Sequence, residues 1–351
     1  MRKYVVYLLR IGILAVAMLL FYLAAVAWGK MALGHTMFYL KEPLTIQEAL
    51  AEAKQQKEAD EDKVYDAAGT GTEEFLDFCI WGQKERVTLT NEALFRSIQA
   101  DAILLCGNPE LLFAGCRFPL PEDGEGCIID EQAAWELFGG VDAVGGEVSY
   151  EGNVYTVRQV IPGREKTVAF QLSDGNGEDG QQKILDRMNV RKSKNGSVTE
   201  LERTIASQFG FAVTILDLEL LHGIAGGCVL LIPCSVCMCF FCYFAGQYKR
   251  QEKITRKAVM AGTILAMAVF FMFLLKCWVN IPDDYIPARW SEFQFWRTLW
   301  EDKANALKFL LQMKKTGIDI GWMGSFYQAV CYGLLAEALF LSISCLKPRT
   351  Q

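Results

Sequence analysis

Long apolar runs alternate with charged stretches along this chain. Four runs are nearly free of charge. Each is about long enough, as a helix rising roughly 1.5 Å per residue, to cross the roughly 30 Å of hydrocarbon in a membrane. We therefore predict four transmembrane helices, over residues 4–29, 216–246, 258–280 and 322–346.

Basic residues beside these runs predict their orientation, because Lys and Arg are enriched in cytoplasmic loops. The link after the third run instead begins with Asp283 and Asp284. Both termini and the link 247–257 are therefore predicted to be cytoplasmic, and residues 30–215 and 281–321 to lie outside. The basic residues concerned are Arg2, Lys3, Arg10, Lys249, Arg250, Lys253, Arg256, Lys257, Lys347 and Arg349.

The first run has a second interpretation. It begins with Met1-Arg2-Lys3 and ends in Ala25-Val26-Ala27, as a cleavable signal peptide would. Its apolar core is longer than such a peptide usually needs, which favours a retained anchor. The rest of the topology is the same in either case.

The large outer segment has the patterns of a mixed α+β domain. A helix is predicted over 43–62, where Thr45 and Glu48 have the capping-box spacing, and another over 198–209. Residues 151–153, Glu-Gly-Asn, form a hairpin turn, and the Gly-, Asp- and Asn-rich residues 173–182 form a loop. Strands are predicted over 75–81, 98–105, 127–129, 147–150, 154–161 and 167–172, with a short helix over 132–138 closed by Gly139 and Gly140.

The outer link 281–321 carries a separate amphipathic pattern. Its apolar residues recur every three or four positions, which places them on one face of a helix. Tryptophan on such a face suits the membrane interface, because the indole ring is apolar and its N–H stays hydrated. The alternative is a helix packed against the outer domain. The candidate interfacial residues are Trp290, Phe293, Trp296 and Trp300, followed by Ala304, Leu307 and Leu311.

A family resemblance rests on one stretch of the outer domain. The segments Gly126-Cys-Ile-Ile-Asp-Glu-Gln-Ala-Ala-Trp-Glu-Leu-Phe-Gly139, Val144-Gly-Gly-Glu-Val and Tyr155-Thr-Val-Arg-Gln-Val160 resemble the MacB-like periplasmic core domain of MacB/FtsX-type ABC transporter permeases. Trp81-Gly82-Gln83 fits the same family. The order of parts, one helix, an outer domain and three helices, is similar as well.

These residues also have a physical interpretation as scaffold. Asp130 stands at a helix N-cap position, where its carboxylate accepts backbone N–H groups. The glycines allow tight turns, and the apolar residues pack the helix and a strand against the sheet. The predicted scaffold residues are Trp81, Cys127, Asp130, Leu137, Phe138, Gly139, Gly145, Tyr155 and Val157.

The resemblance implies a separate ATPase partner. No P-loop string G-x-x-x-x-G-K-[ST] occurs in the sequence, so ATP hydrolysis would belong to another chain. It further implies a homodimer or a heterodimer with a sister permease, a bacterial cell membrane, and mechanotransmission to the outer domain. It implies no enzyme activity or cofactor of the chain's own. The predicted ATPase-coupling residues are Lys249, Arg250, Lys253, Arg256 and Lys257; their alternative role is to fix orientation and contact anionic lipid.

Polar and proline residues inside the predicted spans are further candidates. Pro233 removes a helix hydrogen bond, so a kink is expected there, as a hinge or as static packing. Glu337 is costly in hydrocarbon, so it is predicted to be protonated or to pair with a polar group on a neighbouring helix or a second protomer. Proton coupling or substrate contact is the alternative role. Residues 234–242 carry a C-x-x-C-x-C-x-x-C pattern, but on a continuous helix these thiols spread around about 200° and do not converge on a metal ion.

The remaining chemistry narrows the choice of function. A net charge of −6 with mixed signs gives no support for nucleic-acid binding. His35 and His222, the two histidines, have no catalytic partner at suitable spacing, and the pairing of the four outer cysteines, Cys79, Cys106, Cys116 and Cys127, is left open. A membrane receptor or regulatory protein with a binding ectodomain and no ATPase is the alternative function.

Overall fold

The computed structural model divides the chain into two units, which we describe separately. The membrane unit comprises Met1–Ala32, Asp217–Ile286 and Lys314–Gln351. The domain unit comprises Leu33–Leu216 and Pro287–Met313. The structure describes residues 2–31, 34–55, 76–121, 123–163, 165–173, 183–191, 198–210, 212–216, 218–250, 253–278, 285 and 293–345.

Four long helices form the membrane unit: α1 (Arg2–Gly29), α5 (Leu218–Arg250), α6 (Ile254–Trp278) and α8 (Gly317–Cys345). Each contains a stretch long and apolar enough to cross a membrane, as the hydrophobic pattern predicts. The chain is therefore a multi-pass membrane protein.

Three helix ends lie four or five residues from the sequence-based bounds, and one of them is the start of α6 at Ile254. Helix α5 continues through Lys249 and Arg250, because basic residues are good helix formers and favour helix C-termini. Helix α8 begins at Gly317, five residues earlier than the apolar run. Asp319 accepts hydrogen bonds from the backbone N–H of Thr316 at 2.8 Å and from its hydroxyl at 2.9 Å, which caps this helix start.

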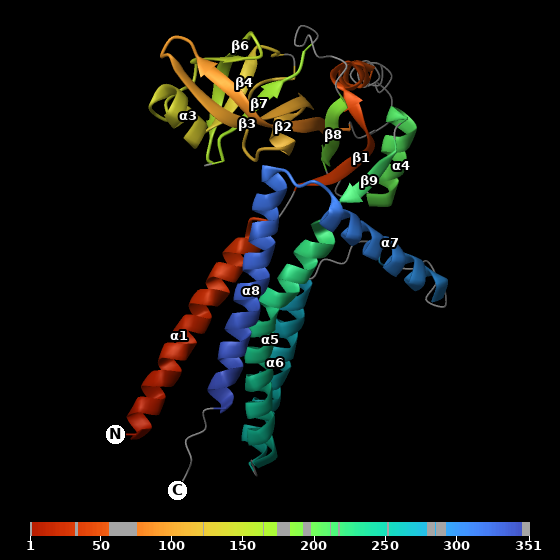
Figure 1. Ribbon diagram of the computed structural model, residues 1–351. Helices are drawn as coiled ribbons and strands as arrows, with labels where there is room; N and C mark the ends of the chain where they lie inside the picture. The colour runs from red at the N-terminus through yellow and green to blue at the C-terminus, as the bar shows by residue number, and fades with distance from the viewer. Residues whose placement is uncertain are drawn as a thin grey trace. The chain divides into compact units, whose positions relative to one another are not determined.

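Small residues bring the membrane helices together. Ala329, Gly333 and Ala336 of α8 are buried, and a side chain at Gly333 would meet the carbonyl oxygen of Cys228 in α5 at 3.1 Å. In lipid, close backbone approach of this kind supplies the packing energy that the hydrophobic effect supplies in water. Helix α6 packs along α5 (Figure 1).

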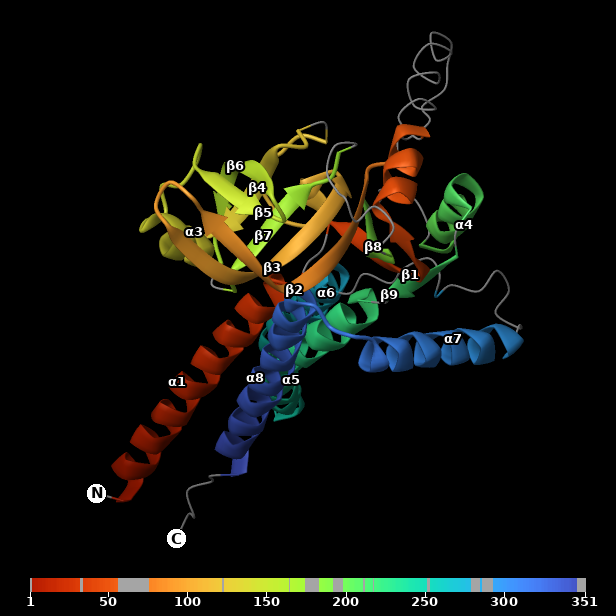
Figure 2. The same cartoon turned by 45° about the horizontal axis from the view of Figure 1, so that its top comes forward.

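Nine strands in one mixed sheet form most of the domain unit. Their order is β3-β7-β4-β6-β5-β2-β8-β1-β9, and β3 also pairs with β2. The first six strands therefore close into a barrel, and β8, β1 and β9 extend the sheet from β2 (Figures 1 and 2). The strands are β1 (His35–Thr45), β2 (Phe78–Asn91), β3 (Arg96–Gly107), β4 (Gly126–Asp130), β5 (Glu147–Tyr150), β6 (Asn153–Ile161), β7 (Thr167–Gln171), β8 (Lys183–Arg191) and β9 (Val213–Leu216).

The helices of the domain lie at different places on this sheet. Helix α3 (Glu131–Phe138) lies beside the barrel, and α4 (Val198–Phe209) lies at the other end of the domain, against β9 (Figure 2). A short 3-10 helix, η1 (Pro109–Leu111), follows β3. Helix α7 (Phe293–Gln312) belongs to this unit through its contact with β9.

Three strands were not predicted from the sequence. Residues 35–45 form β1, so the helix predicted over 43–62 begins only at residue 46; residues 56–75 lie outside the described part of the chain. Strand β8 buries Arg187 and Asn189, which hides its apolar alternation, and β9 has only four residues. The α+β class is confirmed, and each of the six predicted strands overlaps an observed one, although β2 extends to Asn91, well beyond the predicted 75–81.

Two local signals act as predicted. The backbone N–H of Thr45 donates to Glu48 Oε2 at 2.8 Å, and the N–H of Glu48 donates to Thr45 Oγ1 at 3.2 Å. This is the reciprocal capping box. Glu151 and Gly152 have φ of 49° and 83°, the positive pair that a type I′ hairpin turn needs between β5 and β6.

Trp81 is the largest fully buried side chain of the domain core. Its indole N–H donates to Asn189 Oδ1 at 3.1 Å, and the Arg187 guanidinium lies 5.1 Å from its ring centroid. The next residue must be glycine, because a Cβ at Gly82 would lie 2.2 Å from the carbonyl oxygen of Ile184. Trp81 and Gly82 thus fix the point where β2 stops pairing with β8 and continues into the barrel.

Replacing Trp81 with alanine is expected to destabilise the domain by about 3–5 kcal/mol, because a large cavity opens and Asn189 loses its donor. Guanidinium unfolding of the full chain in detergent, followed by the circular dichroism of the sheet, measures the change. Trp135→Ala is the control: Trp135 is 60% exposed on α3, and a change of about 0.5 kcal/mol or less is expected. Equal effects of the two substitutions would contradict this account.

Candidate functional site

The residues that carry the family resemblance build a rigid corner of the barrel. Asp130 ends β4 and caps α3, accepting the N–H of Ala133 at 2.7 Å and, with its second oxygen, that of Glu165 at 2.9 Å. Gly139 closes α3 in the left-handed region at φ 83°, as a helix C-cap glycine does. Leu137 is fully buried beneath the helix. These residues position the backbone at the end of β4 and the start of α3.

The strand side of this corner is equally packed. The N–H of Gly145, at φ 86°, donates to Val157 O at 2.8 Å, and a side chain at Gly146 would meet the ring of Phe138 at 2.3 Å. Tyr155 packs on Phe170 with ring centroids 4.5 Å apart. The motif therefore has a structural role in the domain.

The four cysteines of the domain are free and buried. Cys79 pairs with Gly107 and Cys106 with Ile80 across β2 and β3, so the two thiols point to opposite faces of the sheet. Burial raises the pKa of Cys106 and of Cys127 to about 12 and that of Cys79 well above its ordinary value. These thiols are protonated at neutral pH and poor nucleophiles.

The strands that join the domain to α1 and α5 pair with each other. Met37 of β1 is opposite Leu216 of β9, in antiparallel register. Only Asp217 separates Leu216 from the first residue of α5, and residues 30–34 separate α1 from β1. The chain thus enters and leaves the domain at one edge of its sheet.

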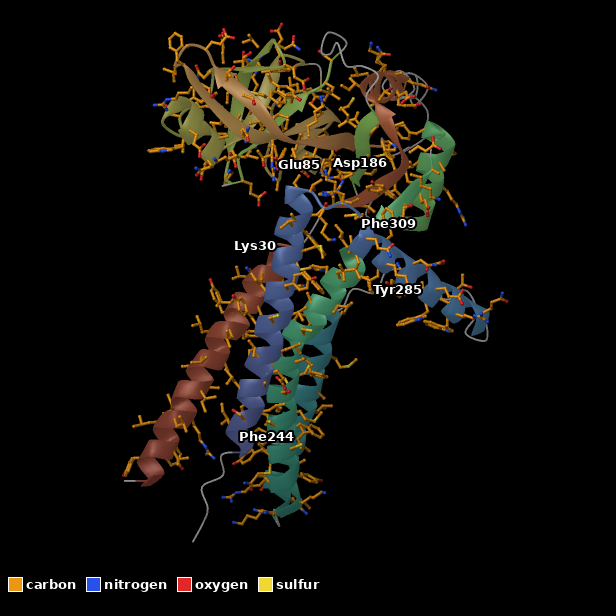
Figure 3. All side chains as sticks on the ribbon, viewed as in Figure 1. Lys30, Glu85, Asp186, Phe244, Tyr285 and Phe309 are labelled. Carbon is orange, nitrogen blue, oxygen red and sulfur yellow. The ribbon has the colours of Figure 1, made fainter. Side chains whose placement is uncertain are left out.

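The end of α7 contacts the same edge of the sheet. The ring of Phe309, labelled in Figure 3, packs edge-on against Tyr39 of β1 with centroids 5.0 Å apart. Burial, and then the neighbouring carboxylate of Asp186, raises the pKa of Tyr39. Residues 313–316 join α7 to α8. Three of the four membrane helices are therefore joined by short links to elements of this edge, which we call the junction: β1, β9 and the C-terminal end of α7.

The basic residues predicted to couple to an ATPase lie at the other end of α5. Lys249 and Arg250 form its last turn, Lys253 lies in the turn, and Arg256 and Lys257 lie in the first turns of α6. The side chains of the first four of these residues are exposed. Lys257 Nζ lies 6.0 Å from the ring centroid of Tyr248. Within the part of the chain that the structure describes, none of the five forms an ion pair.

Aromatic side chains hold three membrane helices together near their junction-side ends. Trp28 of α1 stacks on His222 of α5, with centroids 4.9 Å apart, and donates its indole N–H to the His222 carbonyl at 3.1 Å. Trp322 of α8 donates to Met31 O at 3.3 Å. The histidine predicted to lack a catalytic partner thus has a packing partner.

Glu337 contacts a polar side chain on a neighbouring helix. Ser235 of α5 donates its hydroxyl to Glu337 Oε1 of α8 at 2.5 Å. The second carboxylate oxygen is buried without a hydrogen-bond partner among the described residues. Sequence reasoning did not identify Ser235, although it is a polar side chain within an otherwise apolar run and could have been searched for on that ground.

Replacing Ser235 with alanine is expected to weaken the α5–α8 contact by about 1–2 kcal/mol, because Glu337 loses its donor in a low-dielectric setting. Thermal unfolding in detergent measures the loss. Ser342→Ala is the matched control: among the described residues the Ser342 hydroxyl bonds only to Leu339 O of its own helix, at 2.7 Å, so a smaller effect is expected. A larger loss for Ser342→Ala would refute the assignment.

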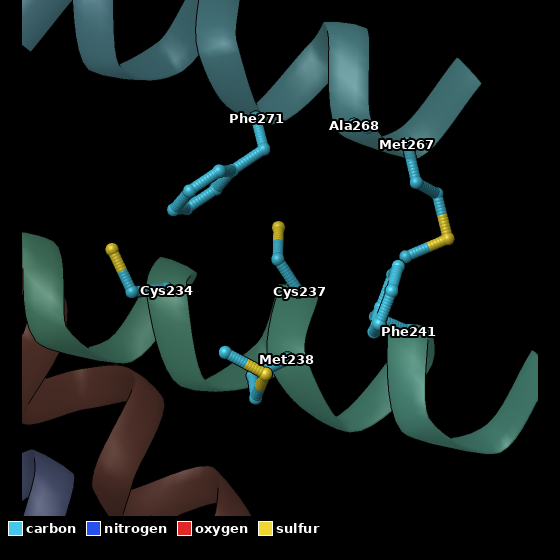
Figure 4. Close-up of a pocket in the computed structure, with 7 residues that line it drawn as sticks. All are labelled: Cys234, Cys237, Met238, Phe241, Met267, Ala268 and Phe271. Atoms are coloured by element: carbon cyan, nitrogen blue, oxygen red, sulfur yellow. The ribbon is translucent and has the colours of Figure 1, made fainter. Parts of the chain in front are cut away.

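The four cysteines of the C-x-x-C-x-C-x-x-C pattern, residues 234–242, spread around helix α5, which continues through Pro233. Cys234 and Cys237 face α6 and line an apolar cavity of about 240 Å³, whereas Cys239 and Cys242 are exposed (Figure 4). Among the described residues, no group of three or more metal-ligating side chains gathers anywhere. The cavity is lined by Cys234, Cys237, Met238 and Phe241 of α5 and Met267, Ala268 and Phe271 of α6.

His35 begins β1 opposite Arg191. Burial, assisted by the positive charge of Arg191, lowers the pKa of His35 to about 4. Arg191 itself is engaged by Asp77 at 2.6 Å and Glu110 at 3.0 Å. This group therefore fastens the start of β1 and contains no catalytic arrangement.

No protein-family model and no curated protein matches the sequence. Among solved structures, the periplasmic region of MacB from Actinobacillus actinomycetemcomitans matches with a TM-score of 0.38 and 11% identity, over 53% of this chain and 90% of that one. The extracellular domain of the noncanonical ABC-type transporter YknZ from Gram-positive bacteria matches with a TM-score of 0.34 and 13% identity, over 52% and 99%. Likenesses this weak carry no functional conclusion for this chain.

Proposed function

We propose that this chain is the permease-type subunit of an ABC transporter complex of the MacB/FtsX kind. A separate P-loop ATPase binds the basic residues Lys249, Arg250, Lys253, Arg256 and Lys257 between α5 and α6, which we call the basic turn. The movement that the ATPase drives reaches the β-rich domain through the membrane helices. The termini and the basic turn lie in the cytoplasm and the domain lies outside, which is the orientation that the Lys and Arg distribution favours. The chain works as a dimer with itself or with a sister subunit in a bacterial cell membrane.

The observation that carries this proposal is the junction. A domain on a flexible tether would not follow the movement of a helix, because a flexible linker absorbs displacement. Here one residue links β9 to α5, and β9 is held by backbone hydrogen bonds to β1, which follows α1. Displacing α5 must therefore displace the edge of the sheet.

The residues inside the membrane favour movement of α5 with its neighbours. Ser235 and Glu337 connect α5 to α8 two residues beyond Pro233, and Trp28 connects α5 to α1. Pro233 is the proposed hinge, since a proline leaves one carbonyl of the helix without its usual donor. The α5–α8 contact would then transmit bending of α5 to α8.

Recovery of an ATPase from membranes tests the proposal. A tagged chain, solubilised in mild detergent, is expected to co-purify with a P-loop protein that hydrolyses ATP. A well-folded preparation that recovers no nucleotide-binding protein under any detergent condition would leave no basis for the assignment.

A further inference from the structure

Helix α7 has two apolar sides with different surroundings. Leu310 at its C-terminal end and Met313 just beyond it are 3% and 9% exposed, and Phe309 packs on β1. On another side, Trp296, Trp300, Leu307 and Leu311 are 42%, 76%, 36% and 56% exposed. In both views of the ribbon, only the C-terminal end of α7 reaches the sheet, and the rest projects away from it (Figures 1 and 2).

The exposed apolar side is one continuous stripe. At about 100° per residue, its four side chains fall within about 60° of arc. Arg297, Glu301 and Lys308 lie beside the stripe on the polar side, and Arg297 pairs with Glu301 at 2.9 Å while remaining 81% exposed. Soluble proteins rarely leave two tryptophans and two leucines aligned in water, so the stripe marks a binding surface.

The chain itself indicates what covers this stripe. In the sequence, helix α7 follows α6 and precedes α8, and both of those helices contain membrane-length apolar spans. Four residues, 313–316, separate α7 from α8, so even a fully extended link allows at most about 18 Å between the two helix ends. Tryptophan, leucine and flanking basic residues are the composition of helices that lie in the headgroup region of a bilayer.

We propose that the Trp296–Leu311 stripe binds the outer leaflet of the membrane while the Phe309 side of α7 holds the junction. The stripe binds lipid, and α7 thereby connects the bilayer surface to strands β1 and β9. The proposal goes beyond the permease assignment and depends on α6 and α8 crossing the membrane in the orientation that the Lys and Arg distribution favours. Its failure and the absence of an ATPase partner are therefore separate results.

Quenching of tryptophan fluorescence by brominated lipid tests the surface. The full chain is reconstituted into phosphatidylcholine–phosphatidylglycerol vesicles, with or without bromine on acyl carbons close to the headgroup. The emission of Trp300 is the difference between the unaltered chain and Trp300→Phe. Brominated lipid is expected to reduce this difference by about half or more, because an interfacial indole lies at that depth.

Trp135→Phe is the matched control. Trp135 is also exposed, but it lies on α3 beside the barrel, so its share of the emission is expected to be the same in both kinds of vesicle. Equal Trp300 emission in both kinds would overturn the proposal; a blue-shifted, unquenched Trp300 would assign the stripe to a protein partner or a second copy. Trp296→Phe repeats the measurement one turn away if Trp300→Phe folds poorly.

Discussion

Replacing Lys249, Arg250, Lys253 and Arg256 with glutamate is expected to abolish recovery of the ATPase. These four side chains are exposed and free of ion pairs within the described residues, so their charge is available to a partner. Reversal turns several attractive contacts into repulsive ones, and a loss of only about 1.4 kcal/mol already weakens binding tenfold. Pull-down from membranes, quantified by ATPase activity per mole of chain, measures the effect.

Charge reversal at this position also tests orientation, since the same residues favour a cytoplasmic location. A reporter fused at residue 180 must therefore stay outside in the variant. Arg117→Glu with Arg203→Glu is the control: both are exposed residues of the domain unit, outside the basic turn and outside the flanks that set orientation, and this variant should leave the ATPase bound. A correctly inserted quadruple variant that still recovers the ATPase would show that the basic turn serves orientation or lipid contact alone.

The second large effect is expected from a six-residue Gly/Ser insertion after Asp217. Such a linker has a root-mean-square length of about 13 Å, which is enough slack to absorb the movement of a helix. The ATPase should still bind and hydrolyse ATP, because the basic turn is unchanged. The domain, however, should no longer respond to ATP.

Hydrogen exchange of the β1 and β9 amides, with and without ATP, measures this response in the reconstituted complex. The same six residues inserted between Glu151 and Gly152 serve as control, because that exposed hairpin turn is remote in sequence from the junction. The control should keep the ATP-dependent change in exchange and the Asp217 insertion should lose it. An undiminished change after the Asp217 insertion would rule out transmission through β9.

The candidate site was only partly visible in the sequence. The basic turn and Glu337 could be selected because charge is rare beside and within apolar runs, and that rarity holds whatever the fold. The partner of Glu337 could not be selected, because Ser235 lies 102 residues away and only helix packing brings the two together. The junction was invisible for the same reason: it consists of two strands from opposite ends of the domain and one helix from beyond it.

The sequence by itself determined the elements whose cause is local. Four apolar runs specify four membrane helices, Thr45 and Glu48 specify a helix start, and Glu151-Gly152 specifies a type I′ turn, since in each case the decisive contacts join residues close in the chain.

The tertiary structure alone decided β1, β8 and β9 and the closure of the barrel. Strand β8 places Arg187 and Asn189 in the interior, where Trp81 of β2 stacks on one and bonds to the other, and Leu111 O accepts a hydrogen bond from Asn189. A strand of this kind has no apolar alternation to recognise. Its stability comes from partners distant in the sequence, 108 residues away for Trp81 and 78 for Leu111, and those contacts exist only once the sheet has formed.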